Sequence, residues 1–475
     1  MIMLIGAVVL LPALVLVAAD RAGAEPTRLD WQPCPDAPED DASGMECAAL
    51  QVPVDWAEPD GRELTLQLGR LPSTGPEPAA GSVLVAYGGP GGPGLAITRQ
   101  NPGIFDELRR RMDVITWDTR GYGAQFGGTS TGLDCIWSRH PTPHLPADAA
   151  ELDRLGRQNL GVGYPCRSRD PELFDHLSSA DQARDMEAIR VALGEPELNF
   201  YGASYAGLYG QTYARLFPDR VRTLVLDGTF PHAVADWEKV LADQARRNEV
   251  TLGRFFAWCA EDRSCALHGR NPERTWRRVV ARADREPLPA TRDGVTYHYD
   301  GTDLRGLALG RARQKEWPAL ARAIRSAERG DASGFLPEPP NSPYPDVPTG
   351  ITECTDLPRF TDHERLTAVA RRLERAAPNL GAAGTLLTNS LHCVGWPAPV
   401  SNPPEPLPAG LPPLLGAGAW DESDAIVPVL EQVPGSALIR HEDAGHTLYQ
   451  FNECARRLID AYFVELAVPE RETVC

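Results

Sequence analysis

The chain has no excess of positive charge, and this absence excludes one broad class of function. Lysine and arginine together number 47, against 65 aspartate and glutamate residues, which gives a formal net charge of −18 at pH 7. Nucleic acids and anionic membranes attract proteins mainly through clustered positive charge. We therefore expect no nucleic-acid partner.

A second long apolar run is also missing, so only one segment of the sequence is a candidate to enter a membrane. Residues 2–17 are almost wholly apolar, and Ala22-Gly23-Ala24 then offers a small-residue cleavage site. This pattern predicts an export signal over residues 1–24, although no lysine or arginine precedes the apolar run. We expect a secreted protein, without a stable membrane partner unless the segment stays uncleaved and holds the chain at the cell surface.

The cysteines lack the C-x-x-C spacing that is typical of many metal sites. Ten of them follow the apolar segment, an even number, and in an oxidising compartment this composition predicts disulfides. The sequence alone leaves the connectivity open. Pairing in chain order would close five local loops: Cys34–Cys47, Cys135–Cys166, Cys259–Cys265, Cys354–Cys393 and Cys454–Cys475.

Short β-rich runs alternate with helical patterns in the first half of the chain. Such alternation favours a mainly parallel sheet with both faces covered. The helical pattern over 180–193 follows what resembles a capping box from Ser179 to Gln182. The strand-like runs lie at 49–54, 64–71, 82–87, 113–117, 198–201 and 221–226.

The pattern changes after residue 228, where a long helical and arginine-rich stretch begins. Strand-like runs return only at 411–415 and 437–439. We therefore predict an α/β chain with a doubly wound, mostly parallel sheet. Its core would consist of residues 25–228 and 409–475, with an inserted, mainly helical lid over 229–408.

The strongest chemical signal is the run Tyr201-Gly202-Ala203-Ser204-Tyr205-Ala206-Gly207. It contains G-x-S-x-G between a predicted strand and a predicted helix. A nucleophilic serine on a sharp turn needs small neighbours, and the following helix directs its positive end toward the reaction. We identify Ser204 as the candidate nucleophile.

A glycine-rich loop, Gly88 to Gly94, follows the predicted strand at 82–87. Acyl transfer needs backbone N–H groups that face the developing oxyanion, and we assign this role to Gly89 and Tyr205. The same loop fits the G-x-G-x-x-G dinucleotide pattern. Pro90 and Pro93 remove two amide donors, and no clear helix is predicted to open at Gly94, so we set nucleotide binding aside.

A general base is expected late in the chain, and His446 follows a glycine in a loop behind the last strand-like run. His441 is the alternative, but it continues the strand directly. The orienting acid should follow the run at 411–415, where Asp421 is our choice and Asp424 the alternative. The two histidines lie five residues apart rather than four, so the spacing does not favour zinc.

These motifs together resemble the proline iminopeptidase and tripeptidyl aminopeptidase branch of the α/β-hydrolases, over nearly the whole mature chain. The resemblance also includes the run Asp118–Gly123, in which Asp118 and Arg120 are expected to brace the site, and Gly445-His446-Thr447. It implies the α/β-hydrolase fold, a triad of Ser204, His446 and an acid, and no metal or organic cofactor. The implied reaction is hydrolysis of peptide substrates from their free N-terminus.

An aminopeptidase must also bind the cationic amine of its substrate, and buried lid carboxylates are the obvious means. Our candidates are Glu353, Asp356 and Asp236. The chain departs from the family in the loop of the expected acid, Asp421 to Ala425, which lacks the usual Thr-Pro. Within the nucleophile motif it also has alanine at Ala203 and Ala206, where such enzymes often have glycine.

Two other functions fit the same motifs. An esterase can use the same frame, because fold alone does not determine the substrate. A non-catalytic binding protein could keep the shell of a hydrolase while its acid loop has changed. The sequence leaves open the number of residues removed per cut, the side-chain preference, the natural substrate and the oligomeric state.

Overall fold

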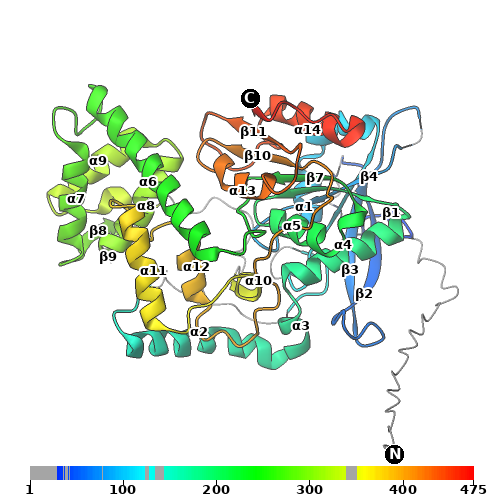
Figure 1. The fold of residues 1–475 in the computed structure, drawn as a ribbon, viewed down its shortest axis with the longest axis horizontal. Helices are drawn as coiled ribbons and strands as arrows, with labels where there is room; N and C mark the ends of the chain where they lie inside the picture. Colours follow the sequence, from blue (N-terminus) through cyan, green and yellow to red (C-terminus); the bar gives the residue numbers. More distant parts are fainter. Residues whose placement is uncertain are drawn as a thin grey trace, which may run out of the picture.

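A central ten-stranded sheet organises the protein in this computed structural model (Figure 1). The structure describes residues 29–475 except for 36, 38–40, 42, 78, 124–127, 134–143 and 338–349. Within them the strand order is β1-β2-β3-β5-β4-β6-β7-β10-β11-β12. The strands are β1 (Gln32–Pro33), β2 (Glu46–Pro53), β3 (Glu63–Leu71), β4 (Ser82–Ala86), β5 (Asp113–Trp117), β6 (Leu198–Ala203), β7 (Val221–Asp227), β10 (Leu415–Ala419), β11 (Ala437–His441) and β12 (Glu472–Val474).

Most of this sheet is parallel, and its carboxyl-terminal edge positions the candidate site. Neighbouring strands are parallel from β5 through β4, β6, β7, β10 and β11 to β12. By contrast, β1, β2 and β3 add antiparallel strands at one end. The mostly parallel α/β sheet predicted from the alternating pattern is confirmed.

Adjacent side chains of β4 enter two different hydrophobic cores. Leu84 and Ala86 belong to the core shared with α4 (Ser179–Leu193) and α5 (Ala206–Leu216). Val83 and Val85 belong to the core beneath α1 (Gly94–Gln100) and α14 (Glu453–Glu465). Because both faces are covered, the central strands read as continuous apolar runs rather than alternating ones.

The segment between β7 and β10 forms a helical layer beside the sheet (Figure 1). Its hydrophobic core is separate from the sheet cores and includes Trp237, Phe255 and Phe256. It also holds a two-stranded hairpin, β8 (Leu288–Arg292) and β9 (Val295–Tyr299), that the helical pattern did not predict. The helices are α6 (Trp237–Glu261), α7 (Pro272–Ala283), α8 (Gly301–Arg313), α9 (Trp317–Glu328), α10 (Gly350–Asp356), α11 (His363–Ala376) and α12 (Leu386–His392).

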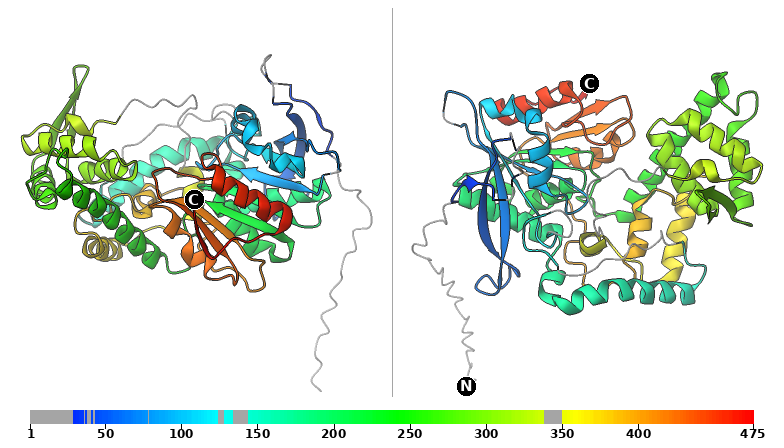
Figure 2. Two further views of the ribbon diagram at one scale, coloured as in Figure 1. Left: turned by 90° about the horizontal axis from the view of Figure 1, so that it is seen from above. Right: turned by 180° about the vertical axis from the view of Figure 1, so that it is seen from behind.

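Two helices join the lid to the sheet domain. Ile351 and Cys354 of α10 pack in the core on the α4 and α5 face, although α10 lies within the predicted lid segment. The long helix α2 (Ala149–Arg169) runs along the lower side of both parts in Figure 1 and in the right view of Figure 2. Its Leu152 enters the lid core, and its Cys166 enters the sheet core.

Four disulfides join cysteines that are neighbours in the chain: Cys34–Cys47, Cys259–Cys265, Cys354–Cys393 and Cys454–Cys475. Pairing in chain order is therefore confirmed for these four. Cys166 is also disulfide-bonded. Cys135, its expected partner, lies outside the described residues.

Two local predictions need correction. The capping box of α4 joins Ser178 to Asp181, one residue earlier than expected, and leaves Ser179 to bond elsewhere. The late strand is β10 at 415–419 rather than 411–415, because the prolines before it cannot donate to a sheet ladder.

The predicted export signal lies outside the described residues, and among the described helices none is long and apolar enough to cross a bilayer.

Candidate active site

Ser204 lies on a tight turn between β6 and α5, where its φ angle is 57°. An L-residue in this left-handed region costs about 1–3 kcal/mol and is held there by its surroundings. The Ser204 amide donates to the carbonyl of Asp227 in β7 at 2.7 Å. A β carbon on Gly202 would lie 2.8 Å from the Ala206 carbonyl oxygen, and one on Gly207 would lie 2.5 Å from the Thr229 side chain. The turn therefore requires both glycines of G-x-S-x-G.

The glycine loop after β4 packs directly against this turn. A β carbon on Gly88 would lie 2.4 Å from the Tyr205 amide nitrogen and 2.6 Å from the Ser204 β carbon. Gly89 is exposed and has a φ of 135°. Within the described part of the chain, neither the Gly89 amide nor the Tyr205 amide donates to a backbone carbonyl. The loop thus places both expected oxyanion donors near the serine and leaves them without competing backbone partners.

The start of α1 at Gly94 corrects the expectation that no helix opens there. This helix does not favour a dinucleotide, however. Its Leu95 amide donates to the Asp118 carboxylate at 3.0 Å, so a side chain already occupies the position where a pyrophosphate would accept. Pro93 precedes the helix and Pro90 lies within the loop, and neither has an amide hydrogen.

His446 is paired with Glu422, a residue that the sequence pattern did not indicate. The His446 Nδ1 atom lies 2.8 Å from Oε2 and 3.0 Å from Oε1 of Glu422. His446 follows β11, and Glu422 follows the neighbouring strand β10. The hydrogen bond to Glu422 raises the pKa of His446, and burial raises the pKa of Glu422. A carboxylate that faces Nδ1 leaves Nε2 as the nitrogen available for proton transfer.

The prediction that Asp421 orients His446 is corrected by this pairing. The side chain of Asp421 is 4% exposed and forms an ion pair with Arg313, whose Nε atom lies 3.0 Å from its Oδ2 atom. The alternative, Asp424, is exposed and pairs with Arg440 at 2.7 Å. No sequence signal separates three acids within four positions, since the directions of their side chains depend on partners elsewhere in the chain. His441, the alternative base, lies against the Cys475 carbonyl at 2.5 Å.

Ser204, Glu422 and His446 directly follow or lie in loops after β6, β10 and β11, at the carboxyl-terminal edge of the sheet. A β carbon on Gly228, which follows β7, would lie 2.8 Å from the His446 carbonyl and 3.3 Å from the Glu422 carboxylate. The buried Asp227 holds the His446 loop, because its carboxylate accepts from the Leu448 amide at 2.9 Å. Ser204 Oγ forms no hydrogen bond to His446 within the described residues, and catalytic contacts of this kind often tighten only when substrate binds.

The three amine-binding candidates occupy different environments. Asp236 is exposed, and its side chain caps α6 by accepting from the Lys239 amide at 2.9 Å. Helix capping therefore explains this residue. Glu353 is 7% exposed on α10 and accepts from Asn389 at 2.9 Å. Its negative charge contributes to raising the pKa of Tyr205, after the larger effect of burial, so it lies close enough to the nucleophile turn to act on it.

Asp356 is fully buried beneath the nucleophile turn and is already occupied by hydrogen bonds. It accepts from the Ser179 amide at 2.9 Å, from the Tyr205 hydroxyl at 2.8 Å and from Asn402 at 3.0 Å. Burial raises its pKa to about 6. These contacts correct its assignment as an amine ligand, because no oxygen is left facing a substrate. Asp356 instead supports the turn through Tyr205.

Asp118 and Arg120 brace the site as expected, but they do not pair with each other. Arg120 donates to both carboxylate oxygens of Asp185 on α4, and both side chains are 0% exposed. Arg120 also donates to the Val54 carbonyl at 2.7 Å. Asp118 accepts from the Thr129 amide at 2.7 Å and from the start of α1. Each residue ties a loop of the sheet edge to a helix.

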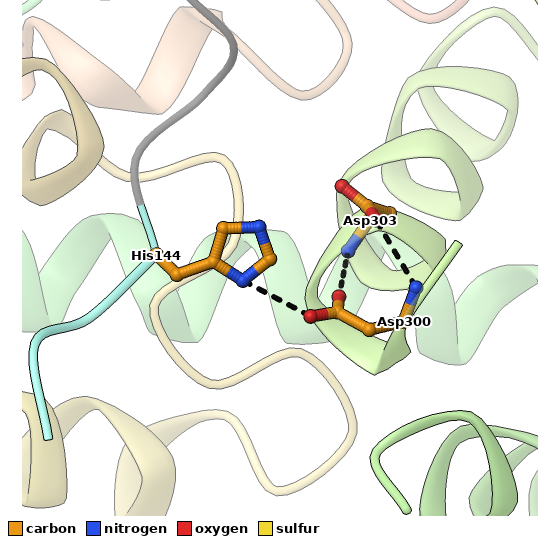
Figure 3. A group of neighbouring side chains, drawn as sticks. All are labelled: His144, Asp300 and Asp303. Atoms are coloured by element: carbon orange, nitrogen blue, oxygen red, sulfur yellow. Dashed lines mark hydrogen bonds and ion pairs between the residues drawn. The ribbon is translucent and has the colours of Figure 1, made fainter. Parts of the chain in front are cut away.

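Among the described residues, one group of metal-binding side chain types occurs where His144 lies beside Asp300 and Asp303 of the lid (Figure 3). Helix capping explains the two acids. The Asp300 carboxylate accepts from the Asp303 amide at 3.0 Å, and the Asp303 carboxylate accepts from the Asp300 amide at 3.1 Å. His144 is exposed and lies 3.0 Å from Asp300. The arrangement therefore reads as the capping box of α8 with a surface ion pair.

The fold and this site define a class of protein: the chain has the α/β-hydrolase fold. The model of the alpha/beta hydrolase fold matches residues 81–310. A second model, described as TAP-like protein, matches residues 379–475 and therefore includes both Glu422 and His446.

Three curated relatives are similar over most of their length. Tripeptidyl aminopeptidase of Streptomyces coelicolor is 27% identical over 98% of this chain and 88% of the relative. Serine protease Hip1 of Mycobacterium tuberculosis is 26% identical over 99% of this chain and 95% of its own length. Carboxylesterase B of Mycobacterium tuberculosis is 26% identical over 90% of this chain and 86% of the relative.

Proposed function

We propose that this protein is a secreted serine aminopeptidase that releases residues or short peptides from the free N-terminus of peptide substrates. The observation that carries the proposal is the position of Ser204 on a left-handed turn, at the same sheet edge as the His446–Glu422 pair. The relatives named tripeptidyl aminopeptidase and serine protease support a peptide substrate. The disulfides support an oxidising compartment.

In this mechanism Ser204 Oγ attacks the carbonyl carbon of the scissile peptide bond. His446 takes the serine proton through Nε2 and then gives it to the leaving amine, while Glu422 accepts from Nδ1 and stabilises the imidazolium. The amides of Gly89 and Tyr205 would donate to the oxyanion. Water then attacks the acyl-enzyme, again with His446 as the base, and releases the N-terminal fragment.

We assign recognition of the substrate amine to Glu353. Glu353 is buried on α10, accepts from Asn389 at 2.9 Å and acts electrostatically on Tyr205 of the nucleophile turn. A buried carboxylate gains most from pairing with an ammonium group, because water does not screen the pair. An enzyme that needs this contact would discriminate against substrates with a blocked N-terminus.

A carboxylesterase is the second candidate function, favoured by the relative of that name. Both reactions use the same acyl-enzyme chemistry, so the triad does not separate them. The free amine does: an aminopeptidase depends on it, whereas an esterase for neutral esters does not.

The proposal is tested with purified protein and its Ser204→Ala variant. Both receive fluorogenic mono-, di- and tripeptide amides with free or acetylated N-termini, together with a nitrophenyl ester. We expect turnover of free peptides only, lost in the variant, and the length of the preferred substrate gives the size of the fragment released. Turnover of the ester alone would establish the esterase. A folded protein without turnover of any substrate would favour a non-catalytic binding protein.

A further inference from the structure

The lid forms an ion pair with the loop after β10, the acid loop, which carries Asp421 and Glu422. This ion pair involves Asp421, whereas Glu422 faces His446. Arg313 is the last residue of α8, and its Nε atom lies 3.0 Å from Asp421 Oδ2. Its carbonyl accepts from the Trp420 indole at 3.1 Å. Its Nη2 atom donates to Asn248 of α6 at 2.8 Å. Arg313 therefore joins two lid helices to the residue immediately before Glu422.

Asp421 is in a position to interfere with the catalytic pair. It is adjacent to Glu422 in the chain, and its side chain is 4% exposed, so water screens its charge poorly. Burial raises the pKa of Asp421, and the positive charges of Arg313, Arg254 and His446 oppose that rise. If the Asp421 side chain turned toward the imidazole, a second carboxylate would compete with Glu422 as the partner of Nδ1.

We propose that Arg313 is a positioning residue that holds Asp421 away from His446, so that Glu422 alone orients the imidazole. The inference rests on the proposed serine hydrolase function and deepens it. By pairing with Asp421, Arg313 fixes the direction of that side chain and offsets its negative charge. The lid would thus set the geometry and the proton affinity of the base without touching the substrate.

The other charged groups around the acid loop make different contacts. Lys315 lies 2.9 Å from Asp443, and the guanidinium of Arg254 lies over the Trp420 ring at 4.8 Å. Arg313 alone among these cations forms an ion pair with Asp421 within the described residues. The charged groups that influence His446 or Asp421 are Glu422 after β10, Asp227 of β7, Arg313 of α8 and Arg254 of α6.

Removal of the Arg313 charge should raise the pKa of His446. Arg313 lowers the pKa of His446, whereas hydrogen bonding to Glu422 raises it. In Arg313→Gln, the imidazole loses a nearby positive charge and Asp421 loses its ion-pair partner, so the pKa of His446 rises. The neutral imidazole that acts as base then forms only at higher pH. Replacing Asp421 by asparagine in the same chain removes the unbalanced charge and the competing carboxylate together.

The test measures the second-order rate at which a fluorophosphonate labels Ser204, from pH 5 to pH 9, and the hydrolysis of a free tripeptide amide. Labelling reports the reactivity of the serine even where the peptide is not a substrate, so a wrong peptidase assignment stays distinguishable from a wrong inference. The proteins are wild type, Arg313→Gln, Arg313→Lys, Asp421→Asn and Arg313→Gln/Asp421→Asn. Arg305→Gln is the matched control, because Arg305 lies on the same helix and pairs with Asp284 at 2.9 Å.

We expect Arg313→Gln to move the acidic limb of the labelling profile to higher pH and to lower the rate at pH 6 several-fold. In the double variant, in Arg313→Lys and in Arg305→Gln, the acidic limb should lie at its wild-type position. An unchanged limb in a folded Arg313→Gln protein would overturn the inference. So would a double variant no better than Arg313→Gln, or loss of labelling in Asp421→Asn, which would make Asp421 itself the orienting acid.

Discussion

The imidazole of His446 faces both oxygens of the Glu422 carboxylate, at 2.8 Å and 3.0 Å from Nδ1. The two residues come from loops after neighbouring parallel strands, β10 and β11, and the Glu422 side chain is 24% exposed. This relationship fixes which ring nitrogen can serve Ser204. It also places Glu422, rather than the predicted Asp421, against the imidazole.

The first prediction concerns pH. The hydrogen bond to Glu422 raises the pKa of His446 above the ordinary value of 6.5, and the base acts only when neutral. The acidic limb of kcat/KM should therefore have its midpoint above pH 6.5. In Glu422→Gln the residual activity should show a limb at lower pH. A limb that stays in place in this variant would contradict the pairing.

The second prediction concerns the oxyanion site. A methyl group on Gly88 would lie 2.4 Å from the Tyr205 amide nitrogen, so Gly88→Ala should displace one donor or block the oxygen it serves. Loss of an oxyanion contact typically lowers kcat by about 10²–10³-fold. Gly253→Ala in α6 is the control, because no atom lies within 4 Å of its added methyl group. Comparable kcat values for the two folded variants would show that the glycine loop does not contribute to the reaction.

The third prediction concerns the substrate amine. Glu353→Gln should raise KM for free tripeptide amides by roughly tenfold or more, as expected when a buried charge-assisted pair is lost. The preference for free over acetylated substrates should shrink by the same factor. Asp236→Asn should leave both quantities unchanged, since Asp236 is an exposed helix cap. If Glu353→Gln keeps the full preference, the amine binds elsewhere.

The fourth prediction concerns stability. Arg120 and Asp185 form an ion pair in which both side chains are 0% exposed, so Arg120→Ala leaves an uncompensated buried carboxylate. The expected loss is about 3–5 kcal/mol in the free energy of unfolding, measured with urea. Arg62→Ala removes a pair with Asp170 in which Arg62 is 43% exposed, and should cost about 1 kcal/mol or less. Similar losses in both variants would show that burial of the first pair is not decisive.

Local sequence patterns were sufficient for the central strands of the sheet and for the nucleophile turn. The runs at 82–86 and 113–117 are recognisable as strands because they are short, mostly apolar and buried on both faces. The turn at Ser204 is recognisable because Gly202 and Gly207 have no room for a side chain. Such features depend on residues close together in the chain, and a pattern can reveal them.

The acid could not be predicted in the same way. Asp421 and Glu422 are adjacent, and their directions are set by Arg313 and His446, which lie far away in the sequence. Asp356 was equally ambiguous, because its role depends on Ser179, Tyr205 and Asn402 converging on it from three other segments. A buried acid looks the same in sequence whether it binds a substrate or supports a turn.

The most direct test of the account compares Glu422→Gln with Asp421→Asn in the hydrolysis of a free tripeptide amide. We predict that Glu422→Gln lowers kcat by about 10³–10⁴-fold, since the imidazole loses its orienting carboxylate. Asp421→Asn should retain kcat within about threefold, because its side chain faces Arg313 rather than His446. The reverse order, with Asp421→Asn nearly inactive and Glu422→Gln active, would contradict the catalytic arrangement described here.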